Sequence, residues 1–270
     1  MSKKKEIVEV GQQAKADSFV LEQPKRSIVG FEIKGRSYIQ NAFSQKAIEE
    51  MLRKHMGLTV QKEKKNPRQV IERAIIRNIE GAVCCPPVAV KCAMLSASSS
   101  LKTFERKKTQ LKTSLFVVGS SIPLTFEKMV PRMDMVRTSG MTRTPDVRFR
   151  PNFINWSARL LIQYSDTLLQ PQSIADLLYR AGDVGVGEWR PEKNGTHGTF
   201  EIARAITSEE ETAEVEAACA IPLKTPEIPE WALDANIDMT LLAKLFSPGG
   251  DGESDGGPAD ESSGKEAEMT

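Results

Sequence analysis

Residues 153–164, FINWSARLLIQY, constrain the fold more than any other part of the chain. Apolar and polar side chains alternate along this segment, with Trp156, Ala158, Leu160, Ile162 and Tyr164 on one side and Asn155, Ser157, Arg159 and Gln163 on the other. A period of two residues is typical of a strand that buries one face and exposes the other. We therefore expect a half-buried strand of a sheet here.

Shorter patterns on either side predict the other elements of the same domain. They fall in the order strand, helix, strand, strand, helix, strand, at residues 27–34, 44–56, 78–85, 153–164, 171–181 and 198–204. This is the order of a ferredoxin-like (RRM-like) βαββαβ core. The sequence therefore predicts an α+β protein in which residues 86–152 form a long insertion.

Individual residues predict where several elements begin and end. Pro67 and Pro87 each stand at a favourable first position of a helix. Gly182 can end the helix at 171–181 by taking the left-handed conformation. Ser208 and Glu211 have the spacing of a capping box, which predicts a short acidic helix after the domain.

The polarity of the chain predicts how it is divided. Residues 1–24 lack sustained periodicity and are expected to form a flexible arm ahead of a globular domain at 25–205. Residues 206–246 are expected to contain the acidic helix, a Pro-rich linker and a short helix at 237–246. Residues 247–270 have almost nothing to bury, which predicts a disordered acidic tail.

Charged residues are distributed unevenly between these regions. Residues 1–205 contain 34 Lys and Arg against 20 Asp and Glu, whereas residues 206–270 contain 3 against 16. A basic body can gain affinity for a polyanion, because neutralising its phosphates releases counterions. The distribution therefore favours a nucleic-acid partner, although a role in solubility would produce it too.

Other features exclude several classes of protein. No run approaches the roughly 18 to 20 apolar residues of a membrane helix, and the first residues lack the apolar centre of a secretory signal. We therefore expect a cytoplasmic protein without membrane contact. The four cysteines are too unevenly spaced for a disulfide framework or a zinc site. No Walker loop or dinucleotide fingerprint is present, so no cofactor is expected.

Two stretches resemble a known family. The glycine-rich GVGEWRPEKNGTHGTFEI resembles the closing glycine loop of the RAMP superfamily, and CPPVAVKCAM is similar to its strand, proline, helix entry, though without the usual glycine-serine pair. RAMP proteins are ferredoxin-like and form the RNA-holding backbone of CRISPR effector complexes. The resemblance implies that RNA or single-stranded DNA lies across a sheet face or along an inserted hairpin.

Residues 27–204 also resemble a group of proteins of bacterial viruses and prophages. The stretches VRFRPNF, NWSARL and AGDVGVGEWRPEKNGTHGTFEI carry this resemblance. It implies a phage or prophage type of protein, acting in the cytoplasm of the host cell, and brings no activity with it.

Two basic regions are candidates for contact with nucleic acid. The first could hold phosphates with flexible point charges and consists of Lys102, Arg106, Lys107, Lys108 and Lys112. The second interleaves arginines with Phe149, Phe153 and Trp156, which suits single strands, and consists of Arg132, Arg137, Arg143, Arg148 and Arg150. The first region could instead be a solvated face, and Phe153 and Trp156 of the second could belong to the core.

The glycine-rich loop is a third candidate. Its glycines could let backbone amides approach a phosphate, at Gly185, Gly187, Gly195 and Gly198. Trp189, Arg190, Lys193 and His197 could add stacking and charge. Alternatively, the glycines serve a turn that needs left-handed residues, and Trp189, Arg190 and Pro191 fill that turn.

An enzyme would have to use His55 or His197 for proton transfer near neutral pH. His197 and Glu188 could form an acid and base pair, because some RAMP nucleases use a loop histidine. His55 lies on an expected helix, where it would be packed or exposed. Because no Ser/His/Asp, zinc or two-metal pattern is present, we expect a protein without catalytic activity.

These observations lead to one hypothesis and two alternatives. The hypothesis is a phage-type homo-oligomer that binds single-stranded DNA or RNA, while its acidic tail competes for the basic groove. The first alternative is an interaction protein that assembles with itself, or with a host or phage protein through the helix at 237–246. The second alternative is a pocket protein that sequesters a nucleotide with the glycine-rich loop.

Overall fold

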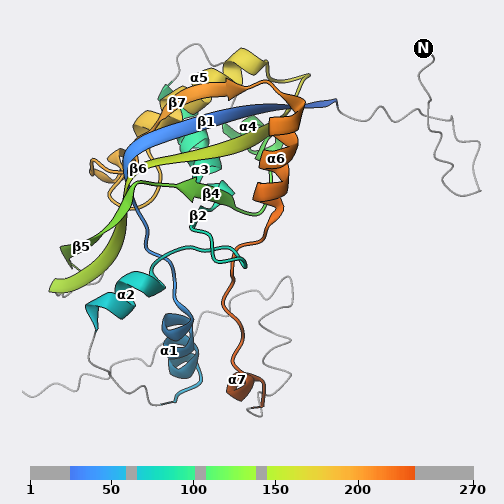
Figure 1. Cartoon of the computed structure of the whole chain (residues 1–270). Coiled ribbons are helices and arrows are strands. Elements are labelled where there is room, and N and C mark those ends of the chain that lie inside the picture. The colour runs from blue at the N-terminus through green and yellow to red at the C-terminus, as the bar shows by residue number, and fades with distance from the viewer. Residues whose placement is uncertain (1–24, 59–65, 101–107, 138–144, 235–270) are drawn as a thin grey trace, which may run out of the picture. The chain divides into compact units, whose positions relative to one another are not determined.

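The computed structural model describes residues 25–58, 66–100, 108–137 and 145–234 (Figure 1). Residues up to Pro226 form one compact unit, and residues from Glu227 onward form a second, in which helix α7 (Glu230–Asp234) is described. The first unit contains a seven-stranded antiparallel sheet with helices, so the prediction of an α+β protein is confirmed. This unit continues past residue 205, where we expected the globular domain to end.

Strand β6 (Pro145–Ser165) is the centre of the sheet and contains the alternating segment 153–164. Along one edge it pairs with β1 (Arg26–Ile39), from Arg26 opposite Ser165 to Ile39 opposite Asn152. Along its other edge three shorter strands follow one another, namely β3 (Leu115–Val117), β4 (Ile122–Thr125) and β5 (Lys128–Arg137). One long strand therefore organises the whole sheet.

Two further strands lie at the sheet margins. Strand β7 (Glu201–Ile206) pairs with β1, and the short strand β2 (Cys84–Cys85) pairs with β4. We expected a strand over residues 78–85, but only its last two residues are a named strand. Gly81, whose φ is 89°, and the bond from Ala82 N–H to the Asn78 side chain turn the chain before them.

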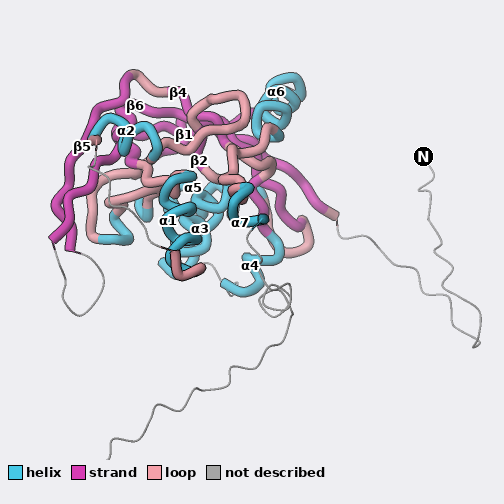
Figure 2. Tube along the Cα trace, turned by 90° about the horizontal axis from the view of Figure 1, so that it is seen from below, coloured by secondary structure: helices cyan, strands magenta, loops and turns pink. Residues whose placement is uncertain are grey.

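Helices α3 (Pro87–Ala97) and α5 (Pro171–Val184) cover one face of the sheet (Figure 2). Their buried residues join the strands in the main core, which includes Val90 and Met94 from α3, Leu177 and Leu178 from α5, and Phe31, Ile33, Leu160 and Ile162 from the sheet. Helix α3 and strands β3 to β5 lie within residues 86–152. The segment that we expected to be an insertion is thus part of the sheet and its helical layer.

Helix α1 (Gln45–His55) begins after Ser44, whose side chain accepts a hydrogen bond from Ala47 N–H. Helix α2 (Pro67–Arg73) begins at Pro67 as predicted. We expected α1 to be the first core helix, but none of its residues is buried, whereas α3 buries five. Its apolar residues are too few and too exposed to cover the sheet.

Helix α5 was expected to end at Gly182. It continues to Val184, and Gly185, with a φ of 80°, ends it. Gly182 has a different role, because a Cβ atom there would lie 2.0 Å from the carbonyl oxygen of Phe200. Close approach of α5 to the segment before β7 therefore requires glycine at residue 182.

Helix α6 (Glu209–Ala220) lies on the opposite side of the sheet from α3 and α5 (Figure 2). The predicted start is confirmed, because the Ser208 side chain accepts from Glu211 N–H. Val215 and Cys219 of α6 pack against Leu161 and Ile206 in a small apolar cluster of their own. The rest of this side, which we call the open face, carries the polar neighbours of the core residues, including Glu32, Lys34, Thr125, Ser157, Arg159 and Arg204.

Strands β5 and β6 extend past the end of β1 as a two-stranded ribbon (Figure 1). Strand β1 pairs with β6 only as far as Asn152, so residues 145–151 pair with β5 alone. We call residues 131–137 and 145–151 the ribbon.

Candidate nucleic-acid interface

The two faces of the ribbon differ in chemistry. Residues that stand opposite each other in an antiparallel pair share a face. Arg132 stands opposite Arg150, and Asp134 opposite Arg148, which makes one face charged. The other face begins at Met129 and Phe153 in the main core and continues as Met133, Met135, Val147 and Phe149. The charged face therefore continues the open face of the sheet.

Arg150 is buried at the base of the ribbon, with 3% of its surface exposed. Its Nη1 atom lies 3.3 Å from Asp134 Oδ2, and its Nη2 atom lies 3.8 Å from Glu188 Oε2. The prediction that Arg150 contacts nucleic acid does not fit this burial. Arg150 and Asp134 form a buried ion pair instead.

Arg132 is half-buried and lies beside this pair. Its Nε atom donates to Asp134 Oδ1 over 2.7 Å, and its Nη1 atom lies 2.8 Å from His197 Nε2. Its guanidinium carbon lies 6.0 Å from the centroid of the Trp189 ring. The indole and guanidinium groups, which the sequence assigned to separate candidate sites, are thus brought together.

The hydrogen bonds of His197 determine its tautomer. Ser37 Oγ donates to Asn152 Oδ1 over 2.7 Å, so Ser37 accepts from His197 Nδ1 over 2.6 Å. Because an arginine can only donate, Nε2 must accept from Arg132, and we assign the ring proton to Nδ1. Burial lowers the pKa of His197, the charge of Arg132 lowers it further, and Asp134 opposes both. The ring is therefore held neutral.

The predicted acid and base pair of His197 and Glu188 is not assembled. Both ring nitrogens are engaged by Ser37 and Arg132, and Glu188 is directed to Arg150. His55 is exposed at the end of α1. Within the described ranges, no group of three or more His, Cys, Asp or Glu side chains could hold a metal ion.

The remaining arginines and lysines of the predicted site are dispersed. Arg137 and Arg148 are exposed on the ribbon, and Arg148 lies 3.8 Å from Asp146. Lys108 and Lys112 lie on helix α4 (Lys108–Ser114) and Lys193 on the 3-10 turn η2 (Pro191–Lys193). Arg190 is bound within its own loop, to Glu192 and the Gly187 carbonyl. Lys102, Arg106, Lys107, Arg143 and the segment 237–246 lie outside the described residues.

The glycine-rich loop, which precedes β7, pairs with β1 next to the first residues of β7. Glu188 N–H donates to the Ile39 carbonyl, and Gly198 N–H donates to the Ser37 carbonyl. A Cβ at Gly187 would lie 2.5 Å from the Ile39 oxygen, and one at Gly198 would lie 1.8 Å from the Val186 oxygen. Close backbone packing therefore accounts for these glycines.

This packing bears on the predicted approach of phosphate to the loop amides. Gly185 N–H donates to Ala181, Gly195 N–H to Arg190 and Gly198 N–H to Ser37. A Cβ at Gly195 would also lie 1.8 Å from the Trp189 carbonyl oxygen. These three amides are already hydrogen-bonded within the protein and are not free for a phosphate.

Two of the aromatic residues expected to stack on bases are in the core. Phe153 and Trp156 are 1% and 2% exposed, and Trp156 packs edge-on against Phe200. Sequence reasoning also missed Arg159 and Arg204 on the open face. Arg159 could have been found, because the polar side of the alternating segment faces outward.

No family model matches the sequence, and no curated protein matches it significantly. Among solved structures, a chain of the type III-B Cmr-beta assembly bound to cognate target RNA has a TM-score of 0.43 and 13% identity, over 67% of this chain and 60% of that chain. This chain thus spans about 60% of the length of that neighbour. Cmr6 from Pyrococcus furiosus has a TM-score of 0.33 and 10% identity, over 66% of this chain and 99% of that chain.

No helix in the described part of the chain is long and apolar enough to cross a membrane.

Proposed function

We propose that the protein binds single-stranded nucleic acid, RNA or DNA, along the open face and the charged face of the ribbon. The contact of Arg132 with Trp189 supports this proposal most strongly. Lys128 and Arg148 lie on the same face of the β5–β6 pair as Arg132. Basic side chains on one surface attract phosphates, and an indole beside a guanidinium offers a base a surface for stacking. Such binding would depend on salt and would tolerate many sequences.

Fluorescence anisotropy of labelled single-stranded RNA and DNA tests the proposal at two salt concentrations. The variant carrying Arg132→Ala and Arg148→Ala should lose affinity, and its salt slope should fall by about 1.4, or about 0.7 for each lost phosphate contact. Arg180→Ala is the control. It removes one exposed cation from α5, on the side of the sheet opposite the open face, where Arg180 pairs with Asp183.

The proposal fails if the wild type shows no salt-sensitive binding to either oligonucleotide at low salt. It also fails if Arg180→Ala, which removes one charge, loses at least half the binding free energy that the double variant loses by removing two, because the effect would then reflect net charge alone. Comparing the RNA and DNA titrations decides between the two polymers. Intact oligonucleotide after incubation would support binding without catalysis.

The acidic tail is proposed to compete with the nucleic acid. A chain ending at Pro226 keeps the whole first unit and removes the acidic residues that follow. It should bind more tightly than the full chain, most clearly at low salt. Equal affinity of the two chains would show that the tail does not compete.

Self-association is a second candidate function, favoured by the apolar face of the ribbon. Met133 and Met135 are 66% and 76% exposed, and β5 pairs only with β6 in the described sheet. An unpaired strand edge next to apolar side chains suits the same ribbon of a second copy. Light scattering should show a dimer or larger species that Met133→Ser with Met135→Ser dissociates. A wild type that is monomeric at high concentration would exclude this candidate.

A further inference from the structure

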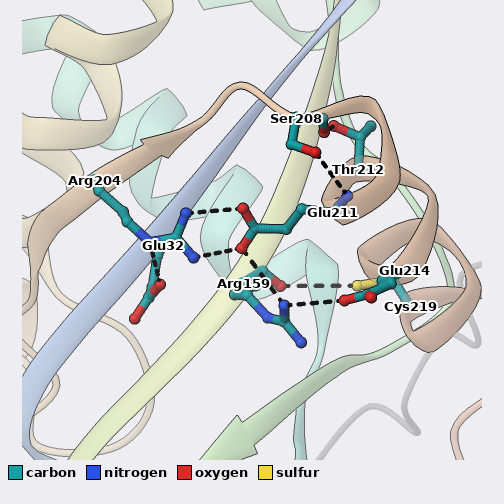
Figure 3. Close-up of polar contacts among 8 residues, drawn as sticks. All are labelled: Glu32, Arg159, Arg204, Ser208, Glu211, Thr212, Glu214 and Cys219. Carbon is teal, nitrogen blue, oxygen red and sulfur yellow. Dashed lines mark hydrogen bonds and ion pairs between the residues drawn. The ribbon is translucent and has the colours of Figure 1, made fainter.

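A second pair of arginines lies on the open face, close to helix α6 (Figure 3). Arg159 extends from β6 and Arg204 from β7, and neither belongs to the ribbon. Both contact carboxylates of α6. Arg204 Nη1 donates to Glu211 Oε2 over 2.8 Å, and its Nη2 atom donates to Glu211 Oε1. Arg159 Nη1 lies 3.5 Å from Glu211 Oε1 and 3.7 Å from Glu214 Oε2.

The carboxylate of Glu211 therefore lies between two guanidinium groups. Two parallel N–H donors facing two oxygens is the geometry by which arginine binds carboxylates and phosphates alike. A phosphodiester has the same charge as this carboxylate and also offers two non-bridging oxygens as hydrogen-bond acceptors. The arginine pair is thus shaped for a phosphate, and a side chain of the protein occupies it.

A hollow of about 290 Å³ adjoins the arginines. Besides Arg159 and Arg204, its lining includes the hydroxyl groups of Thr125 and Ser157 and the carboxylate of Glu32. Hydroxyls can donate to or accept from a sugar or a phosphate oxygen. The hollow can therefore accommodate the sugar next to a bound phosphate among polar side chains.

Release of Glu211 would not require α6 to leave the sheet. Val215 and Cys219 hold the helix against Leu161 and Ile206, and the Cys219 carbonyl accepts from Ser120 and Ser121 N–H. Glu211 lies in the first turn, away from these contacts, and its side chain is 20% exposed. Rotation of the Glu211 side chain alone frees Nη1 and Nη2 of Arg204, while Glu32 keeps its bond to Arg204 Nε and Glu214 keeps its contact with Arg159.

We infer that Arg159 and Arg204 bind one phosphodiester group of a single strand, and that Glu211 occupies this site while no nucleic acid is bound. The inference rests on the proposed function and adds a phosphate site and an internal competitor to it. Helix α6 has five glutamates and no basic residue. Its negative charge therefore also repels a polyanion that approaches this site.

The glutamine variant of the competitor tests the inference. Glu211→Gln removes the charge that holds the arginines and should tighten binding of a labelled single strand about fivefold, because an exposed ion pair competes only modestly with a ligand. Glu216→Gln is the matched control. It removes the same charge from the same helix at an exposed residue for which the structure shows no arginine contact. Its effect on affinity should be less than twofold.

A second pair of variants locates the effect at the arginines. Arg159→Lys with Arg204→Lys keeps both charges but loses the two-pronged donor geometry. It should weaken binding, and Glu211→Gln added to it should no longer tighten binding. Thermal unfolding of each variant verifies that it is folded.

The outcomes separate this inference from the proposed function. If Glu211→Gln and Glu216→Gln tighten binding equally, or if neither does, the inference is overturned, while loss of binding by the Arg132 and Arg148 variant would still support the proposed function. If neither the wild type nor Glu211→Gln binds a single strand at low salt, both fail.

Discussion

The Nη1 atom of Arg132 donates a hydrogen bond to Nε2 of His197 over 2.8 Å. The bond exists only while the imidazole is neutral, because a protonated Nε2 has no lone pair to accept with. Arg132 lies on β5, and His197 lies in the glycine-rich loop. The protonation state of this ring therefore controls one of the contacts between the loop and the base of the ribbon, beside the ion pair of Arg150 and Glu188.

Stability should fall at mildly acidic pH because of His197. Its pKa in the folded protein is lowered, chiefly by burial, so below the ordinary value of 6.5 the unfolded chain binds more protons than the folded one. The free energy of unfolding is then highest above that value and falls as pH decreases towards the lowered pKa. Urea unfolding at about pH 7.5 and about pH 5.5 should show a smaller loss for His197→Gln than for the wild type. Equal losses would contradict the prediction.

The buried pair of Arg150 and Asp134 should be far more sensitive to mutation than an exposed pair. Asp134→Ala leaves the guanidinium of Arg150 buried beside Glu188 only, and should lower the free energy of unfolding by about 3–5 kcal/mol. Asp183→Ala breaks the exposed pair with Arg180 and should cost less than about 1 kcal/mol. Denaturant titration of both variants measures the difference. Equal costs would mean that Arg150 finds another partner.

Two glycine substitutions separate steric exclusion from backbone strain. Gly81 and Gly198 both have positive φ, 89° and 75°, but a Cβ at Gly81 meets no atom within 4 Å, whereas one at Gly198 meets the Val186 oxygen at 1.8 Å. Gly81→Ala should cost about 1–2 kcal/mol from strain alone. Gly198→Ala should cost clearly more, because the backbone of the loop at Val186 must also move away from residue 198. Thermal unfolding that ranks them in the opposite order would show that the loop adapts.

The alternation of core-facing and open-facing residues along β6 is interrupted at Asn155, because Phe153 and Trp156 on either side of it are both in the core. Its φ is 47°, a left-handed conformation that asparagine tolerates better than most residues, and its side chain donates to Glu127. Asn155→Ala should lower stability by about 1–2 kcal/mol, and Asn155→Gly should lower it less. Calorimetry of the two variants measures this. If glycine costs as much as alanine, the bond to Glu127 rather than the backbone is what matters.

Local patterns in the sequence predicted some elements well and others poorly. The alternation of residues 153–164 predicted part of β6, and Pro67, Pro87 and Ser208 predicted where three helices begin. The assignment of 86–152 to an insertion rested on order along the chain. No local pattern shows that three short strands pair with the same edge of one long strand.

The predicted site illustrates the same limit. Arg148 and Arg150 look alike in sequence, yet one is exposed and the other is buried against Asp134 and Glu188, which come from different segments. The contact between Arg132 and Trp189 joins two candidates that the sequence treated separately. Burial and long-range pairing decide such cases, and both depend on the completed fold.

The pairing of β1 with β6 has a consequence for how the chain is made. Arg26 of β1 pairs with Ser165 of β6, and the other partner of β1, strand β7, begins at Glu201. The ribosome must therefore synthesise most of the first unit before β1 can pair with either strand. Contacts between such distant residues close slowly. Until then a long strand carrying Phe31, Ile33, Tyr38 and Ile39 stays unpaired, which makes the nascent chain a candidate for chaperone binding.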